Sequence, residues 1–244
     1  AYEIVSRDWS SDVCSSDLKK HFPNLVIPPH SGDEGMSFGG IEWLRIKNNL
    51  PKFKLPNFPY VQIDEAPKSE PSEKTIQIAA ELLAEGKAIA WYQGHGEVGP
   101  RALGNRSILF DPRIPGGKQR INEIKRRENY RPFGASILEE YAKEYFDMDW
   151  NDDYMLYVGK TLKDNLQSIT HVDGTCRVQT VGDKNPVFRK LLEKFHEITG
   201  CPVLLNTSMN LAGLPMAGYP GVAKQLFYIT NLDAVFVGDE YTVK

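Results

Sequence analysis

Four polar segments of the sequence combine residue types that could bind a phosphorylated ligand. They are GHGEVGPRALGNRS (94–107), KRRENYRPF (125–133), THVDGTCR (170–177) and NTSMN (206–210). Each segment lies just before or just after an apolar run that is typical of a strand. In open α/β sheets, ligands bind beyond the ends of the strands. We therefore expect the four segments to converge on one cleft.

The first segment is rich in glycine and carries Arg101 and Arg106, with Ser107 at its end. It lacks the lysine-containing phosphate-loop pattern and is a poor match to GxGxxG before a helix. Its glycines let the backbone approach a ligand closely, so both arginines and the serine are candidates for nucleotide binding. The alternative is an ordinary surface loop rich in glycine and proline.

The second segment combines Lys125, Arg127 and Arg131. On a helix, the side chains of Lys125 and Arg127 would diverge by about 200°, so both meet one ligand only where the helix ends. Pro132 supplies such an end, because proline disfavours helical geometry in the residue before it. Arginine forks together with a lysine point charge suit a phosphate-rich ligand. The alternative is a solvent-facing basic surface that is paired with nearby glutamates.

The third segment places His171 beside Asp173 and Arg177. A histidine near phosphate can move a proton close to neutral pH, which makes His171 a candidate catalytic residue. A hydrogen-bonded histidine without a catalytic role is the alternative. Cys176 has no partner at CxxC spacing, so we expect no zinc site here.

The fourth segment presents Asn206, Ser208 and Asn210 directly after the apolar run Val203–Leu205. Small side chains with amide and hydroxyl groups suit a compact planar group such as a carbamoyl or a carboxylate. The alternative is an Asx-type turn that makes only local backbone hydrogen bonds.

Basic residues are concentrated in one stretch of the chain. Residues 101–131 hold nine lysines and arginines and three acids, although the whole chain has a net charge of −3. One basic island in an otherwise acidic protein indicates a compact polyanion pocket. General nucleic-acid binding would instead favour a basic character throughout the chain. A solvated basic helix face is the remaining alternative.

Helix and strand patterns alternate around these segments. Ser72 can cap a helix with an apolar stripe that ends at Gly86. Further helices are predicted at 118–129, 139–146, 187–198 and 222–229, and strands at 87–92, 108–110, 135–138, 154–158, 177–181, 202–205 and 234–237. This intermixing predicts an α/β fold with a mixed sheet.

The chain divides into four parts. Residues 1–18 are polar and aperiodic and resemble translated sequencing-adapter sequence, so we expect them to be non-native or disordered. Residues 19–49 hold a short predicted strand at 25–27 and a predicted helix at 36–46. Residues 50–71 contain five prolines, which predict a linker or a tethered surface strand. Residues 72–244 form the main domain.

The composition excludes several classes of protein. Hydrophobic residues make up 41% and charged residues 25% of the chain, as in ordinary globular proteins. The longest apolar run is five residues, whereas a membrane-spanning helix needs about 20. Three cysteines are too few for a disulfide framework. We therefore expect a cytoplasmic protein with no membrane partner and no nucleic-acid partner, and a homodimer stays open.

Taken together, GPRALGNRSIL, KRRENYRPF, HVDGTCRVQ and LLNTSMN resemble the C-terminal domain of the O-carbamoyltransferases of nodulation-factor and antibiotic biosynthesis. The resemblance covers about residues 72–244. It implies a YrdC-like domain, with a twisted mixed β-sheet flanked by helices. It also implies the Lys-x-Arg and Ser-x-Asn signatures of that fold, here Lys125-x-Arg127 and Ser208-x-Asn210. Three departures from the family pattern are Met209, Ala135 and the run LPMAGY at 214–219.

The string PPHSGDEGMSFGG (28–40) resembles the last segment of the same family's actin/Hsp70-like N-terminal domain. Residues 19–49 would then be the C-terminal remnant of that carbamoyl-transfer domain. Asp33 would match a metal ligand there, for Fe²⁺ or another divalent metal. The family's metal-binding histidines lie upstream of anything present, so the chain is expected to be a truncated protein.

The resemblance implies ATP-dependent formation of carbamoyl adenylate from carbamoyl phosphate, with Mg²⁺ on ATP, for transfer to a small hydroxylated acceptor. For this reaction, the candidate catalytic residues are Lys125, Arg127, His171 and Arg177. The candidate binding residues are Arg101, Arg106, Ser107, Arg131, Asn206, Ser208 and Asn210.

Two other functions stay open. One is threonylcarbamoyl-adenylate synthesis for tRNA modification, which uses bicarbonate and threonine; the segment around Asp33 and the HVDGT and GPRALG strings count against it. The other is a non-catalytic RNA-binding module that uses the basic island. RNA recognition usually needs exposed aromatic residues for stacking, and the island offers only Tyr130 and Phe133.

Overall fold

The computed structural model describes residues 16–25, 27–30, 35–52, 57–61 and 65–244 of the 244-residue chain. The predicted disorder of residues 1–18 is untested over 1–15, which lie outside the described residues. Residues 16–21 are helical, and the Ser16 hydroxyl accepts a hydrogen bond of 2.7 Å from the Val158 N–H. Leu25 and Ile27 are not in a strand, so the strand predicted at 25–27 is wrong at these two positions.

The main domain is built on a mixed sheet that has nine strands in the described part of the chain. Its spatial order is β11-β10-β2-β4-β9-β5-β8-β7-β6. The strands are β2 (Ile89–Tyr92), β4 (Arg106–Phe110), β5 (Gly134–Leu138), β6 (Phe146–Asp147), β7 (Tyr157–Thr161), β8 (Thr175–Val181), β9 (Val203–Ser208), β10 (Ala234–Val237) and β11 (Glu240–Val243). The pairs β10–β2 and β5–β8 are parallel and the other pairs are antiparallel. The predicted α/β fold with a mixed sheet is therefore confirmed.

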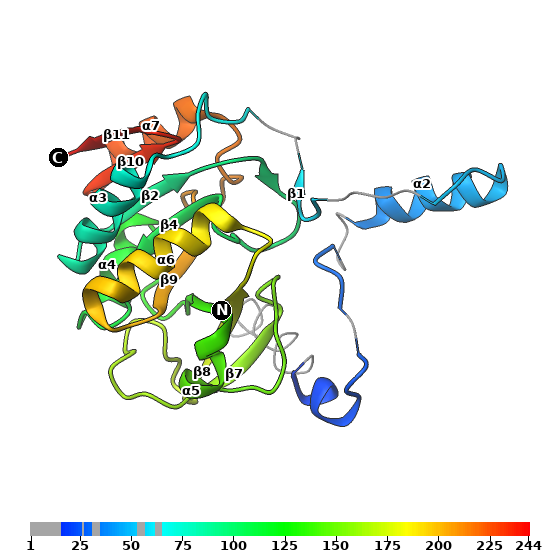
Figure 1. The fold of residues 1–244 in the computed structure, drawn as a ribbon, viewed down its shortest axis with the longest axis horizontal. Coiled ribbons are helices and arrows are strands. Elements are labelled where there is room, and N and C mark those ends of the chain that lie inside the picture. The colour runs from blue at the N-terminus through cyan, green and yellow to red at the C-terminus, as the bar shows by residue number, and fades with distance from the viewer. Residues whose placement is uncertain (1–15, 26, 31–34, 53–56, 62–64) are drawn as a thin grey trace.

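Helices α3 (Glu73–Ala84) and α6 (Pro186–Thr199) pack against each other and against the sheet (Figure 1). The Ser72 side chain accepts a hydrogen bond from the Thr75 N–H and so caps α3, as predicted. Apolar residues at helical spacing face inward, and Gly86 ends the helix with a φ of +77°. Helix α7 (Pro220–Ile229) packs on β10 and β2.

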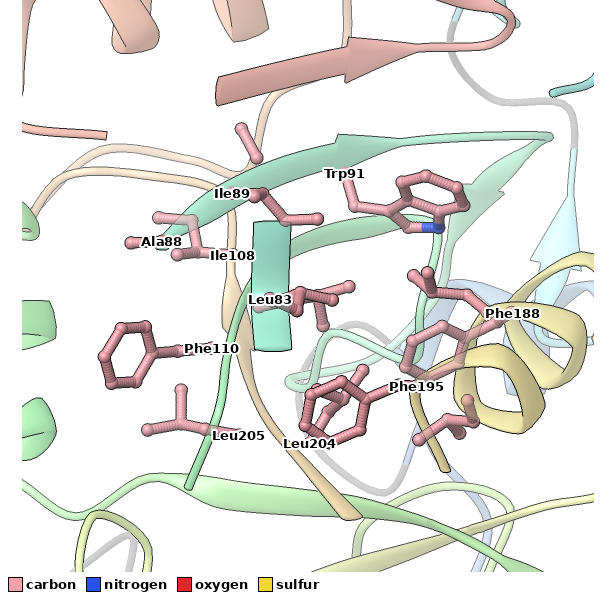
Figure 2. Close-up of a cluster of buried hydrophobic side chains, with 14 of the residues drawn as sticks. Leu83, Ala88, Ile89, Trp91, Ile108, Phe110, Phe188, Phe195, Leu204 and Leu205 are labelled. Carbon is pink, nitrogen blue, oxygen red and sulfur yellow. The ribbon is translucent and has the colours of Figure 1, made fainter. Parts of the chain in front are cut away.

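One part of the hydrophobic core lies between α3, α6 and the central strands (Figure 2). Leu83 of α3 lies among Trp91 of β2, Phe195 of α6 and Leu204 of β9, and all four side chains are buried. This packing fixes the central strands, and the polar segments that follow them extend from a rigid base.

The structure corrects several predicted boundaries. The strand predicted at 202–205 is β9, which extends to Ser208. The basic helix predicted at 118–129 is α4 (Gly117–Ile124), which ends early because Arg126 adopts a φ of +53°. The helix predicted at 139–146 is split into a 3₁₀ turn, η2 (Glu139–Tyr141), and α5 (Ala142–Tyr145). The strand predicted at 154–158 starts three residues later, at Tyr157.

The later start of β7 has a local cause. The buried Asp152 carboxylate accepts hydrogen bonds from the backbone N–H groups of Tyr154, Leu156 and Tyr157, at 2.9, 2.6 and 2.9 Å. Met155 has a φ of +55° inside this turn. A carboxylate that binds three amides within four residues holds the chain in a turn, although the apolar run there is typical of a strand.

The proline-rich segment 50–71 is attached to the main domain where the structure describes it. Strand β1 (Tyr60–Val61) pairs antiparallel with β3 (Gly96–Glu97) of the glycine-rich segment. The Tyr60 hydroxyl donates a 3.0 Å hydrogen bond to the Leu103 carbonyl, and the Tyr92 hydroxyl donates to the Glu65 carbonyl. Where the structure describes it, the segment is therefore tethered to the main domain and contains a two-residue strand.

Upstream, α2 (Met36–Lys47) confirms the helix predicted at 36–46, and it extends away from the main domain (Figure 1). None of its residues is buried, although it carries Trp43 and Leu44. No helix in the described ranges is both long and apolar enough to span a membrane.

Candidate functional site

Cationic side chains from three distant stretches, together with polar side chains from a fourth, line one cavity of about 200 Å³. We call it the cationic cavity. Its lining includes Arg101, Lys125, Arg127, Arg131 and Arg177. The remaining lining residues are Pro100, Ala102, Gly134, Met155, Asn206, Thr207, Ser208, Asn210, Leu211, Ala212 and Gly213. The predicted convergence of the four polar segments is thus present in the structure, and the third contributes Arg177.

Lys125 lies at the base of this cavity, directly after α4. Its ammonium group donates to the Ser208 carbonyl and, at 2.9 and 3.0 Å, to the Asn210 side-chain and backbone oxygens. The Ser208 hydroxyl donates to Asn210 Oδ1 at 2.6 Å. The Lys-x-Arg and Ser-x-Asn signatures therefore lie in direct contact.

Burial, followed by the charges of Arg127 and Arg131, lowers the pKa of Lys125 well below its ordinary value. An ammonium group in this position is stabilised when an anion enters the cavity, because the anion offsets both effects.

Arg127 is held against the cavity wall by its neighbours. Its Nε donates a 2.6 Å hydrogen bond to Asn122 Oδ1, and its guanidinium group lies 4.5 Å from the centre of the Phe133 ring. Burial, followed by the charges of Arg131 and Arg177, lowers the pKa of Arg127 to about 10. The positive charges of the cavity therefore disfavour the charged forms of their neighbours.

The lining contains no carboxylate among the residues that the structure describes. Glu128 forms an ion pair with Arg131 at 3.3 Å, but it is 57% exposed and lies outside the lining. Five positive charges without an acid in the same cavity make a strong anion site. The same lining does not fit a resident Mg²⁺ ion, which prefers carboxylate oxygens.

Asn206 of β9 adds an acceptor to this cationic lining. Its Nδ2 donates to the Ala102 carbonyl at 3.1 Å and to the Ser136 hydroxyl at 2.9 Å. Because a carbonyl can only accept, these bonds fix which end of the amide is nitrogen. The buried Oδ1 atom has no hydrogen-bond partner in the described part of the chain. A ligand that donates an N–H group would satisfy it.

Arg106, predicted in the same site, lies elsewhere. It is 1% exposed, its guanidinium group lies 3.6 Å from the centre of the Tyr92 ring, and it donates to the Gln93, Gly94 and Asn105 carbonyls. Its position on β4, paired with Tyr92 of β2, directs it into the base of the glycine-rich segment. The prediction that Arg106 binds nucleotide is corrected, because these contacts make it structural.

Ser107 is also outside the cavity lining. It is fully buried, and its hydroxyl accepts a 3.1 Å hydrogen bond from the Gly104 N–H. Ser107 of β4 therefore holds the backbone of the loop that carries Arg101.

Glu97 was missed in the sequence, although it is the only acid in the glycine-rich segment. Its buried carboxylate accepts hydrogen bonds from the N–H groups of Leu103, Asn105 and Arg106, at 2.7, 2.8 and 3.2 Å. Burial raises the pKa of this carboxyl to about 7. The residue organises the loop that brings Arg101 to the cavity.

His171 does not line the cationic cavity. Its Nδ1 lies 3.4 Å from Asp173 Oδ1 in a turn closed by the 2.8 Å bond from the His171 N–H to the Thr175 carbonyl. Burial lowers the pKa of His171, and the Asp173 carboxylate acts in the opposite direction. The Arg177 charge also lowers the pKa of His171, so the two residues interact although His171 itself lies outside the lining.

The candidate metal ligand Asp33 lies outside the described residues. Within the described ranges, no group of three or more His, Cys, Asp or Glu side chains could hold a metal ion. Cys176 and Cys201 are free and buried, and burial raises the pKa of both thiols.

Residues 80–244 match the family model described as Carbamoyltransferase C-terminus. Among curated proteins, the chain is 38% identical over 249 residues to the uncharacterized protein MJ1058 of Methanocaldococcus jannaschii, covering 91% of this chain and 40% of that protein. It is 36% identical to the nodulation protein NolO of Bradyrhizobium diazoefficiens, covering 89% of this chain and 44% of that protein. It is also 36% identical to the 3'-hydroxymethylcephem-O-carbamoyltransferase of Amycolatopsis lactamdurans, covering 79% of this chain and 39% of that protein. The chain thus spans about two fifths of the length of these relatives.

Solved structures support the fold. P. abyssi Sua5 complexed with L-threonine superposes with a TM-score of 0.50 at 17% identity, covering 69% of this chain and 48% of that one. E. coli YciO gives a TM-score of 0.50 at 16% identity, covering 73% of this chain and 91% of that one. The predicted YrdC-like domain is therefore confirmed as a fold.

Proposed function

Since the chain belongs to the carbamoyltransferase C-terminus family, we propose that its cationic cavity binds ATP and carbamoyl phosphate and forms carbamoyl adenylate. Water hydrolyses carbamoyl phosphate to carbamate and phosphate. A carbamate oxygen then attacks the α-phosphorus of ATP, and the bond to the β-phosphate breaks to release pyrophosphate. The products are carbamoyl adenylate, pyrophosphate and phosphate.

The observation that carries this proposal is the lining of five cationic side chains without a carboxylate in the described residues. ATP and carbamoyl phosphate together bring about six negative charges into one site, which repel each other unless cations compensate them. Arg127, Arg177 and Lys125 would also stabilise the charge that develops at the α-phosphate, usually the largest catalytic effect.

Asn206 supports a carbamoyl group as the second ligand. Its buried Oδ1 needs a donor, and the amino group of carbamoyl phosphate supplies one where an acetyl group would not. Ser208 and Asn210, already held by Lys125, would complete the wall around this group.

Mg²⁺ enters this proposal only as part of the MgATP substrate, because the described lining offers no carboxylate to hold it. In the longer relatives, the carbamoyl group would pass to the hydroxyl of a small acceptor. We propose that the present chain makes carbamoyl adenylate and needs further polypeptide for that transfer.

The RNA-binding alternative loses support. Of its two candidate stacking residues, Tyr130 is 51% exposed, but Phe133 is buried beneath Arg127. For threonylcarbamoyl-adenylate synthesis, the support is the fold alone, since the Sua5 likeness has 17% sequence identity. Supplying threonine with bicarbonate, in place of carbamoyl phosphate, would separate the two enzymes.

The test is pyrophosphate release from ATP in the presence of carbamoyl phosphate. Arg127→Ala and Arg177→Ala should each abolish release while the circular dichroism spectrum stays that of the wild type. Lys74→Ala, an exposed cation on α3, is the matched control and should retain full activity. Wild-type release by both cavity variants would contradict the assignment.

A further inference from the structure

A second and larger cavity lies on the other side of the glycine-rich segment. Its volume is about 440 Å³. Pro100, Arg101 and Ala102 of this segment face the cationic cavity, whereas its two ends line the second one. We call it the linker cavity, because the proline-rich segment forms one wall. Its lining is Asn57, Phe58, Tyr60, Glu70, Pro71, Gln93, Gly94, His95, Asn105, Asp183, Lys184, Asn185, Pro186 and Val187.

The charge of the linker cavity is opposite to that of the cationic cavity. Glu70 and Asp183 are exposed and form no ion pair with any residue that the structure describes. Lys184, the one lysine of the lining, is already paired with the Asp153 carboxylate. Each carboxylate does act on a cation of α6 from a distance, because Asp183 raises the pKa of Arg189 and Glu70 raises that of Lys190. The cavity therefore presents two carboxylates that no direct ion pair occupies in the described residues.

Gln93 contributes a buried acceptor to the lining of this cavity. The residue is 1% exposed, and its Nε2 donates to the Gly238 carbonyl at 3.1 Å. That bond fixes the orientation of the amide, because a carbonyl only accepts. Oε1 is then left buried and without a partner among the described residues. A buried acceptor in this state is unfavourable, because the hydrogen bond to water that it lost on folding has not been replaced.

In the other two buried side-chain amides of the lining, Asn105 and Asn185, the oxygen atom accepts a hydrogen bond. Asn105 donates to the His95 carbonyl at 2.9 Å, and its Oδ1 accepts a 2.9 Å bond from Asn185. Asn185 in turn accepts from the Phe188 N–H and so caps α6. Gln93 thus differs from them because its side-chain oxygen accepts no hydrogen bond in the described residues. The proline-rich segment adds the aromatic rings of Phe58 and Tyr60 to the lining.

We propose that the linker cavity binds a small organic cation that carries a protonated amine. An ammonium group has three donors and no acceptor, which matches Gln93 Oε1 and the two carboxylates. Methylene groups of the same ligand would pack on the two aromatic rings. The site is independent of the proposed carbamoyl adenylate chemistry, because no side chain of the cationic cavity contributes to it.

The test is calorimetric titration of the chain with putrescine, at ionic strength held constant with NaCl. Butane-1,4-diol is the matched probe, with the same carbon chain and no charge. We expect saturable binding of putrescine at one site and at least roughly tenfold weaker binding of the diol, the factor for an acceptor that loses a charged donor.

Three variants examine the lining. Asp183→Asn and Glu70→Gln should each weaken putrescine binding by about two- to fivefold, as expected for exposed ion pairs. Gln93→Leu should weaken putrescine binding roughly tenfold. Because Gln93 is buried, this variant can fail to fold, and the double variant Asp183→Asn/Glu70→Gln then tests the site in its place.

Glu85→Gln, an exposed acid outside the lining, should leave putrescine binding unchanged. Arg127→Ala should also leave it unchanged, although that substitution removes ATP binding under the proposed function. The proposal would be overturned if putrescine binding did not saturate or if the diol bound equally well. It would also be overturned if the double variant bound putrescine with unchanged affinity.

Discussion

Replacing Lys125 with methionine should separate function from stability. In the folded chain, the ammonium group is buried beside Arg127 and Arg131, which lower its pKa together with burial. Its partners are the oxygens of Ser208 and Asn210 at the cavity wall, where water can replace the lost donor. The loss of these hydrogen bonds is offset, because the substitution also removes a charge that burial and two arginines disfavour. We therefore expect the free energy of unfolding to stay within about 1 kcal/mol of wild type.

Ligand binding should respond in the opposite way. A hydrogen bond to a charged group contributes about 1.5–3 kcal/mol, so loss of the Lys125 ammonium should weaken ATP binding by roughly 10- to 150-fold. The assay pairs calorimetric titration of ATP with urea denaturation, and Lys74→Met, exposed on α3, is the control. Unchanged ATP affinity together with a loss of more than about 2 kcal/mol in stability would refute the reasoning, because Lys125 would then be structural.

Three further predictions concern residues around the cavity. Burial raises the pKa of the Glu97 carboxyl from 4.5 to about 7, so the folded chain holds a proton that the unfolded chain loses first. The contribution of Glu97 to the free energy of unfolding therefore falls by roughly 3 kcal/mol as pH rises from about 4.5 to 7. Denaturation at a series of pH values should show that Glu97→Gln removes this part of the pH dependence. Arg106→Ala should lower the free energy of unfolding by about 3 kcal/mol in the same assay, since it removes a buried guanidinium group that donates to three backbone carbonyls; a loss below about 1 kcal/mol would contradict the structural role. His171→Ala should retain pyrophosphate release within about threefold, and a loss comparable to that of Arg127→Ala would return His171 to the catalytic set.

The sequence was sufficient where local chemistry decides the structure. The cap at Ser72 and the stop at Gly86 are written in residue types that allow few alternatives, and the structure has both. The shortened α4 and the late start of β7 were not predictable, because they depend on positive φ angles at Arg126 and Met155. Neither residue type favours such a conformation, so tertiary contacts must impose it.

The same contrast between local sequence patterns and tertiary contacts applies to the site. Residue type and segment order brought Lys125, Arg127 and Asn206 together, as the structure does. The sequence could not distinguish Arg101 from Arg106, since both are arginines in one glycine-rich segment. Strand pairing with Tyr92 buries Arg106, while Arg101 remains in the loop that reaches the cavity. That difference is set by the register of the sheet, which no local pattern fixes.

The central claim is that cations from separate stretches of the chain form one site for a triphosphate. Calorimetric titration with ATP over a series of NaCl concentrations, with and without carbamoyl phosphate, tests it most directly. We predict one ATP per chain, an affinity that falls steeply as NaCl rises, and loss of binding in Arg127→Ala. Absence of ATP binding, or binding that neither salt nor Arg127→Ala changes, would contradict it.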